Sequence, residues 1–191
     1  MELQALHEKF QSLFNTEGIV YTSPGRINLI GEHTDYNGGF VLPGAIDKAM
    51  YCIIKPNDTS DKIRAYAMDL SEMAEFDLKT PPVKQWAKYI FGVCQEMIKR
   101  EAKLHGFDCV FAGDVPLGAG MSSSAALESC FGFAINDLFN CGFDRFELAK
   151  IGQATEHNYV GVKCGIMDQF ASCFGKEGSL IRLDCRTLEY E

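Results

Sequence analysis

A run rich in glycine and serine joins two segments of different character in the middle of the chain. Residues 107–112 (FDCVFA) are apolar and aromatic, as expected for a β-strand, whereas residues 125–139 are rich in helix-forming residues. The run between them, GDVPLGAGMSSS, contains three glycines, and glycine allows positive φ angles and a close approach of the backbone to a ligand. The pattern therefore predicts a strand, a tight turn and a helix.

The composition of this turn is typical of an anion-binding site. Free N–H groups and the positive end of the helix dipole attract phosphate groups at the start of a helix, and serines 122–124 supply hydroxyls and an N-cap. The spacing of Gly113 and Gly118 matches the Walker motif, but Ala119-Gly120 replaces its Lys-Ser/Thr pair. Ser123 occupies the third glycine position of the protein-kinase loop. The turn is thus predicted to bind a nucleotide triphosphate, with an ordinary serine-capped turn as the alternative.

A second loop holds the densest group of chemically active side chains. Residues 31–39 read GEHTDYNGG, with two carboxylates and a histidine among three glycines. A loop that only reversed the chain would need the glycines but not Glu32, His33 and Asp35 together. Ionised carboxylates accept hydrogen bonds from neighbouring hydroxyl groups, so the loop suits a neutral polyol.

Strand and helix patterns alternate along the rest of the chain. A capping-box sequence at 144–147 (DRFE) marks one helix start, and Pro81-Pro82 interrupts the pattern before another. The predicted helices lie at 2–14, 83–104, 125–139, 144–157 and after 165. The predicted strands lie at 19–22, 26–30 (after a turn at 23–25), 45–55, 62–68, 72–78, 107–112 and 179–184. This alternation does not define how the strands are ordered.

Composition excludes several classes of partner. The chain has 18 basic and 26 acidic residues, a net charge of −8, and no basic run, which argues against nucleic-acid binding. The N-terminus lacks the features of a signal peptide, and no apolar run is long enough to span a bilayer, so we expect a cytoplasmic protein with no membrane partner. The eight cysteines are single and lack metal-ligand spacing, which favours buried free thiols.

Three ordered motifs resemble those of a known kinase family. Residues 25–37 (GRINLIGEHTDYN) resemble the galactokinase signature, and residues 116–125 (PLGAGMSSSA) match the phosphate loop of its superfamily, which includes homoserine, mevalonate and phosphomevalonate kinases. Residues 164–170 (CGIMDQF) complete the series. The resemblance implies an α+β fold with a mixed sheet packed by helices, similar to domain 2 of ribosomal protein S5. It identifies residues 1–191 as an N-terminal sugar- and ATP-binding domain whose C-terminal domain is absent from this chain.

The resemblance also implies a reaction, in which ATP phosphorylates galactose at its anomeric hydroxyl with Mg²⁺ bound, giving galactose 1-phosphate and ADP. Asp168 would accept the anomeric proton or hold the hydroxyl in line, while Arg26 would keep Asp168 ionised and offset charge on the phosphate. The implied sugar-binding residues are Glu32, His33, Thr34, Asp35, Gly165 and Asp168. The implied nucleotide-binding residues are Gly118, Ala119, Gly120, Met121, Ser122, Ser123, Ser124 and Trp86. The implied Mg²⁺ ligands are Glu156 and Ser124, with Ser123 as the substitute.

Simpler interpretations of these residues stay open from local sequence. Asp168 could be the N-cap of the helix that follows it, Glu156 an exposed helix residue and Trp86 a core residue. At the level of function, a related kinase for N-acetylgalactosamine or arabinose would share the phosphate machinery. A galactose- and ATP-binding transcriptional sensor is a further alternative, although the intact serine run argues against it. The 191 residues alone are expected to bind ligands weakly and to turn over little or nothing.

Overall fold

The computed structural model describes residues 3–116 and 118–191, so Leu117 of the predicted phosphate loop lies outside the described part. The helices are α1 Leu3–Phe14, α2 Ala87–Ile98, α3 Ser123–Leu138, α4 Arg145–Thr155 and α5 Met167–Phe174, with a 3-10 turn η1 at Asp35–Asn37 and a π-helical turn η2 at Glu156–Val160. The strands are β1 Ile19–Asn28, β2 Phe40–Val41, β3 Pro43–Pro56, β4 Lys62–Ala67, β5 Glu72–Asp77, β6 Phe107–Gly113 and β7 Leu183–Asp184.

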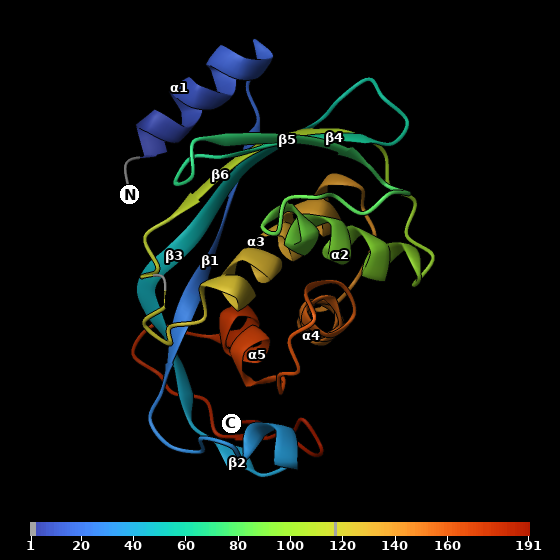
Figure 1. The fold of residues 1–191 in the computed structure, drawn as a ribbon. Helices are drawn as coiled ribbons and strands as arrows, with labels where there is room; N and C mark the ends of the chain where they lie inside the picture. Colours follow the sequence, from blue (N-terminus) through green and yellow to red (C-terminus); the bar gives the residue numbers. More distant parts are fainter. Residues whose placement is uncertain (1–2, 117) are drawn as a thin grey trace.

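A five-stranded sheet forms the frame of the domain. Its order is β1-β3-β6-β4-β5, with β4 and β6 parallel and the other neighbours antiparallel. Helices α2 to α5 lie on one face of the sheet and α1 lies on the other (Figure 1). The sheet is mixed and packed by helices, which confirms the predicted fold class. Among the described residues, no helix combines the length and apolar character needed to cross a membrane.

Strand β6 is central and is buried on both sides. Cys109 and Phe111 belong to the main core, whereas Val110 and Ala112 pack against α1 in a second, smaller core. Successive side chains of a strand point to opposite faces, so a continuous apolar run is what a strand covered on both faces requires. Because β6 ends at Gly113, it brings the glycine-rich turn to the point where the central helix α3 begins.

The two strands predicted at 19–22 and 26–30 form one strand, so the turn predicted at 23–25 is wrong. β1 runs through this segment with a bulge between Pro24 and Arg26, where its register with β3 shifts. Proline is tolerated because β1 is an edge strand and Pro24 adjoins the bulge. Gly25 is needed for packing, since a Cβ there would lie 2.8 Å from the carbonyl oxygen of Met121. Pairing with β3 therefore overrides the local turn signal.

Several helix and strand boundaries also differ from prediction. α2 begins at Ala87 and ends at Ile98, which is shorter than 83–104, because the chain turns back at Glu101, whose φ is 69°. The capping box at Asp144 is confirmed, but α4 gives way to the π-helical turn at Glu156. The strand predicted at 179–184 is reduced to β7, which pairs with β2 and forms an isolated bridge between Leu183 and Tyr190. All eight cysteines are free thiols, as predicted, but only five are buried, because Cys141, Cys164 and Cys185 are partly exposed.

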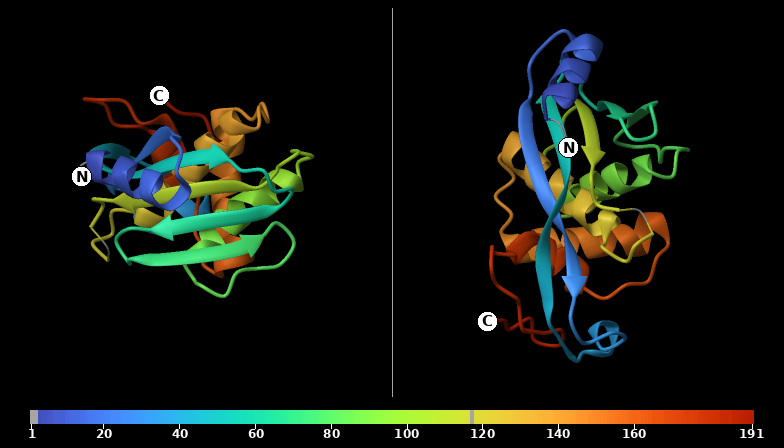
Figure 2. Two further views of the ribbon diagram at one scale, coloured as in Figure 1. Left: turned by 90° about the horizontal axis from the view of Figure 1, so that it is seen from above. Right: turned by 90° about the vertical axis from the view of Figure 1, so that its left-hand side faces the viewer.

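The long hairpin of β1 and β3 extends beyond the helices and carries the loop of residues 29–39 at its end (Figure 2). The C-terminal segment lies beside this loop, because β7 pairs with β2. α3 packs against β1, β3 and the helices α2, α4 and α5. The start of α3 is therefore held firmly relative to β1, from which Arg26 projects, and to α5, which carries Asp168.

Candidate active site

The glycine-rich turn leads directly into α3. Gly118 and Gly120 have φ angles of +73° and +70°, which explains why glycine stands at both positions. Ser122 also adopts a left-handed conformation, with φ 55° and ψ 53°, at a cost of about 1–2 kcal/mol. It occupies the N-cap position, but its side chain forms no capping hydrogen bond with the described residues of the helix. A serine therefore stands at the N-cap, as predicted, but without the capping hydrogen bond, because the Ser122 hydroxyl is used elsewhere.

That hydroxyl donates a hydrogen bond to Oδ2 of Asp168. Arg26 binds the other oxygen, Oδ1, through Nε at 2.8 Å and Nη2 at 2.7 Å. The third nitrogen of the guanidinium, Nη1, donates to the carbonyl oxygen of Gly120, and the backbone N–H of Arg26 donates to that of Met121 at 3.2 Å. Arg26 thus joins the aspartate to the glycine-rich turn, and the structure brings these predicted residues together.

Asp168 does not cap α5, so that simpler interpretation is wrong. The N-cap is Ile166, and Asp168 lies in the first turn, where a carboxylate interacts favourably with the helix dipole. Glu156 is only 4% exposed, so the interpretation as an exposed helix residue is also wrong. Neither Asp168 nor Glu156 is therefore a fully solvated surface side chain.

Asp35 and Gly165 are in close contact, as expected of two residues predicted to share a site. Asp35 accepts hydrogen bonds from the backbone N–H groups of Ile166 at 3.0 Å and Met167 at 3.3 Å. A Cβ on Gly165 would lie 1.9 Å from the carboxyl carbon of Asp35, so only glycine fits. Burial raises the pKa of Asp35, while hydrogen bonds from Cys185 and these backbone groups lower it. Asp35 therefore anchors the segment that carries Asp168.

The other loop residues are divided between exposed and structural positions. Glu32 and His33 are exposed, whereas the Thr34 hydroxyl donates to the carbonyl oxygens of Gly31 at 2.6 Å and Phe40 at 2.9 Å. Thr34 therefore holds the shape of the loop, and its hydroxyl is already engaged. Glu32 Oε1 accepts a hydrogen bond from Asn28 Nδ2 at 2.9 Å.

Asn28 is a site residue that the sequence did not single out. Its Oδ1 is buried and has no hydrogen-bond donor among the described residues. A buried oxygen of this kind usually has a partner, so Asn28 provides an unsatisfied acceptor beside Glu32. The alternating pattern at 26–30, which puts Asn28 on the same strand face as Arg26, is the signal that could have identified it.

Ser124 and Glu156, the predicted metal ligands, are in contact. Burial raises the pKa of Glu156, a hydrogen bond from Ser124 lowers it, and the charge of Asp168 raises it again. Hydroxyl and carboxylate oxygens suit Mg²⁺, which also takes phosphate oxygens and water as ligands. Within residues 3–116 and 118–191, no group of three or more His, Cys, Asp and Glu side chains is placed to hold a metal by itself. The two residues therefore fit a metal that a nucleotide helps to bind.

Trp86 borders a small apolar pocket next to the turn. The pocket has a volume of about 270 Å³, and its lining includes Tyr89, Phe111, Ser123 and Ser124. Trp86 also packs against Phe111, with ring centroids 5.4 Å apart, and its Nε1 donates to Glu72 at 2.9 Å. The interpretations of Trp86 as a core residue and as a pocket residue are therefore compatible.

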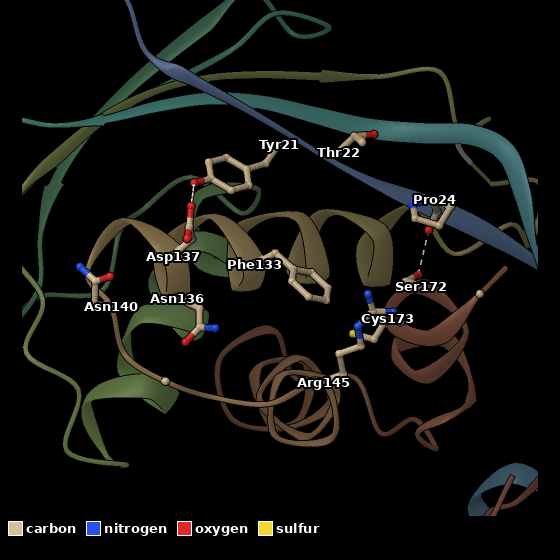
Figure 3. Close-up of a pocket in the computed structure, with 12 residues that line it drawn as sticks. Tyr21, Thr22, Pro24, Phe133, Asn136, Asp137, Asn140, Arg145, Ser172 and Cys173 are labelled. Carbon is tan, nitrogen blue, oxygen red and sulfur yellow. Dashed lines mark hydrogen bonds between the residues drawn. The ribbon is translucent and has the colours of Figure 1, made fainter.

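A larger cavity of about 750 Å³ lies between β1 and helices α3 to α5 (Figure 3). Many of its polar groups already have partners within the protein. Tyr21 donates to Asp137, Ser172 donates to the carbonyl oxygen of Pro24 at 2.8 Å, and Arg145 donates to that of Cys173 at 2.9 Å. None of the predicted site residues lines this cavity. The candidate site is therefore the region between the turn and the loop of residues 31–39.

Comparison with known proteins agrees with this fold. Residues 88–176 match the family described as the GHMP kinases N terminal domain. The crystal structure of Methanococcus jannaschii mevalonate kinase shares the fold, with a TM-score of 0.75 and 19% identity over 91% of this chain and 55% of that chain. The chain therefore carries an N-terminal domain of the GHMP kinase class.

Within that class, residues 8–56 match the galactokinase galactose-binding signature. The galactokinases of Chloroflexus aurantiacus and Lactobacillus helveticus are each 41% identical to the chain, which covers 49% and 51% of their lengths. The crystal structure of Lactococcus lactis galactokinase complexed with galactose superimposes with a TM-score of 0.92 and 40% identity, over 99% of this chain and 50% of that chain. The chain belongs to the galactokinase family, and it spans about half the length of the curated relatives it matches.

Proposed function

We propose that this chain supplies the N-terminal sugar- and ATP-binding domain of a galactokinase, whose C-terminal domain lies outside the chain. The complete kinase transfers the γ-phosphoryl group of ATP to the anomeric hydroxyl of galactose and releases galactose 1-phosphate and ADP. The observation that carries the proposal is the contact of Asp168 with both Ser122 and Arg26. Since Arg26 also donates to the carbonyl oxygen of Gly120, one side chain connects the Asp168 carboxylate to the glycine-rich turn. The galactose bound by the Lactococcus lactis relative supports the choice of sugar.

Asp168 acts on the attacking hydroxyl. Ser122 already presents a hydroxyl to Oδ2 of Asp168, and this contact indicates where a sugar hydroxyl would donate. Asp168 then holds the hydroxyl in line with the phosphorus atom or accepts its proton. Arg26, whose guanidinium lies between Asp168 and the turn, offsets the negative charge that develops on the transferred group.

The nucleotide binds along the turn and the pocket beside Trp86. The backbone and hydroxyl groups of residues 118–124 hold the phosphates at the start of α3. The pocket of about 270 Å³ beside Trp86 and Tyr89 receives the adenine, because its lining is mainly apolar and aromatic. Ser124 and Glu156 would hold Mg²⁺, which when bound neutralises charge on the phosphate oxygens.

The sugar binds between the loop of residues 31–39 and the start of α5. Glu32, His33 and Asp35 provide its polar contacts, together with the backbone of Gly165. Thr34 contributes by holding the loop, because its hydroxyl is engaged with two carbonyl oxygens. Asn28 adds an unpaired buried oxygen next to Glu32. Because ATP is a cytoplasmic metabolite, the cytoplasm is the proposed location.

A substrate panel with the complete kinase tests the proposal. Galactose, N-acetylgalactosamine and arabinose are each supplied with ATP and Mg²⁺, and sugar phosphate and ADP are measured. We expect galactose to be the preferred acceptor. Preference for another sugar would favour a related kinase, and sugar and ATP binding without turnover would favour the transcriptional sensor. The 191-residue chain alone should show weak binding and little or no product, so robust single-turnover phosphorylation by it would contradict the two-domain requirement.

A further inference from the structure

A glutamate that plays no part in the proposed reaction is buried where three helices meet. Glu128 of α3 is 1% exposed, and its Oε2 accepts a hydrogen bond at 3.1 Å from Nε2 of Gln169 in α5. Gln169 directly follows Asp168 and is equally buried. Gly152 of α4 leaves room for the pair, since a Cβ there would lie 2.8 Å from Gln169 Cγ and 3.4 Å from Glu128 Oε2.

Each partner in this pair retains one unsatisfied oxygen. Among the described residues, no group donates a hydrogen bond to Oε1 of Glu128 or to Oε1 of Gln169, although both atoms are buried. An ionised carboxylate cannot remedy this, because both of its oxygens are acceptors. Exchanging the positions of the Gln169 amide nitrogen and oxygen does not help, because the amide oxygen would then face Oε2 of Glu128 and neither atom carries a proton. A single proton on Glu128 Oε1 remedies both deficits, because it can be donated to the oxygen of the amide that already donates to Oε2.

The surroundings of Glu128 also disfavour a charge. Burial raises the pKa of Glu128 well above its usual value, and the negative charges of Glu156 and Asp168 raise it further, although the hydrogen bond from the amide lowers it. The other groups that interact with it electrostatically are the phenol of Tyr89 and the thiol of Cys164. Burial, followed by the carboxyl groups of Glu156 and Glu128, raises the pKa of Tyr89 to about 12, and burial with Glu156, Glu128 and Asp168 raises that of Cys164 to about 12, so both groups are neutral.

We propose that Glu128 is a neutral carboxylic acid that forms a cyclic pair of hydrogen bonds with Gln169 and thereby positions Asp168 against the glycine-rich turn. Glu128 lies one helical turn after Ser124, and Gln169 adjoins Asp168, so the two hydrogen bonds fix α5 to α3 next to both. Because the pair of Glu128 and Gln169 is neutral, it adds no negative charge near the phosphate groups of the nucleotide. The state of the pair is independent of the reaction, whereas its effect on Asp168 rests on the proposed function.

Glu128→Gln tests the neutral state, because a glutamine amide can form the same two hydrogen bonds. A group whose pKa is raised by folding contributes stability that is complete below its unfolded pKa and is lost as the pH rises towards its folded pKa. The unfolding equilibrium constant of wild type, divided by that of Glu128→Gln, should therefore rise with pH above roughly pH 4.5, by up to about tenfold per pH unit, until the pH reaches the folded pKa. Urea unfolding between about pH 5 and 8 measures this ratio. A ratio that stays constant or falls with pH would overturn the proposal.

Glu96→Gln is the matched control. Glu96 is 4% exposed, yet its pKa is lowered, because hydrogen bonds from Lys99, Arg100 and Asn158 outweigh the effect of burial. Its stabilising contribution is present above the unfolded pKa and is lost as the pH falls through the folded pKa. The same ratio for Glu96→Gln should therefore stay constant between about pH 5 and 8, in contrast to that for Glu128→Gln. A similar rise with pH for both variants would show that burial alone, and not protonation, explains the result.

Infrared spectroscopy and kinetics complete the test. Wild type should show a protonated-carboxyl band at neutral pH that is missing from Glu128→Gln, and its absence from wild type would refute the neutral acid. In the complete kinase, Glu128→Met should lower kcat roughly 10- to 100-fold with little change in KM, and Glu128→Gln should rescue most of this loss. Equal losses in both variants would refute the positioning role. A wild-type kinase without turnover would instead refute the proposed function, while the stability and infrared results would still decide the state of Glu128.

Discussion

Arg26 holds Asp168 with two N–H groups and the glycine-rich turn with a third, so a double-mutant cycle can measure how strongly the two residues are coupled. The cycle compares wild type with Arg26→Met, Asp168→Asn and the double variant. Methionine keeps much of the length of arginine without its donors, and asparagine keeps the shape of aspartate without its charge. The difference between the double variant and the sum of the single variants gives the energy of the pair.

The structure indicates the magnitude of this coupling. The Arg26 side chain is 12% exposed and that of Asp168 is 26% exposed, with nitrogen to oxygen distances of 2.7 and 2.8 Å. Ion pairs exposed to solvent contribute about 0.2–1 kcal/mol, whereas hydrogen bonds to charged groups contribute about 1.5–3 kcal/mol. We therefore expect a coupling energy of about 2 kcal/mol, which is roughly 30-fold in the unfolding equilibrium constant.

Urea unfolding followed by tryptophan fluorescence provides the assay, because Trp86 is the single tryptophan of the chain. Lys62 and Glu75 form the control pair, since they lie 3.1 Å apart but are 58% and 55% exposed. Their coupling should stay below about 0.5 kcal/mol. A coupling between Arg26 and Asp168 no larger than that of the control would show that the guanidinium does not hold the aspartate to the turn.

Three further variants test other parts of the site. In the complete kinase, Asp168→Ala should abolish turnover while ATP binding, measured by calorimetry, largely survives; retained turnover would exclude the assigned role. Gly165→Ala should lower the free energy of unfolding by about 2 kcal/mol or more, because the added Cβ would lie 1.9 Å from the Asp35 carboxyl carbon, and unchanged urea stability would contradict that close contact. Trp86→Leu should weaken ATP binding roughly 3- to 10-fold without affecting galactose binding, and an equal effect on both ligands would indicate general unfolding of the domain.

The features that the sequence predicted well are local ones. The apolar run of β6, the glycine-rich turn and the start of α3 occupy adjacent residues, so pattern and conformational preference act on the same short segment. The capping box at Asp144 is likewise complete within four residues. Residues far apart in sequence, such as Arg26, Gly120 and Asp168, were brought to one site by the resemblance of ordered motifs and not by any local pattern.

The errors arise where distant segments determine the structure. The turn predicted at 23–25 is absent because β3 pairs along the whole of β1, and no property of Ser23, Pro24 or Gly25 reveals that partner. Likewise, serine is a common N-cap residue, but the hydroxyl of Ser122 binds Asp168, which lies 46 residues later, instead of the helix backbone. In both cases a tertiary contact competes with a local preference and is the stronger of the two.

The protonation state of Glu128 likewise depends on residues that are distant in the sequence. In the sequence it is one glutamate in a helical segment, where a charged and solvated side chain is the usual expectation. Its burial depends on α4 and α5 packing against α3, and its missing hydrogen-bond donor is apparent only beside the missing donor of Gln169. Because the two deficits belong to the same pair, one proton satisfies both, and the protonation state follows from the packing of three helices. Residue type alone therefore gives the wrong charge for a side chain close to the proposed phosphate site.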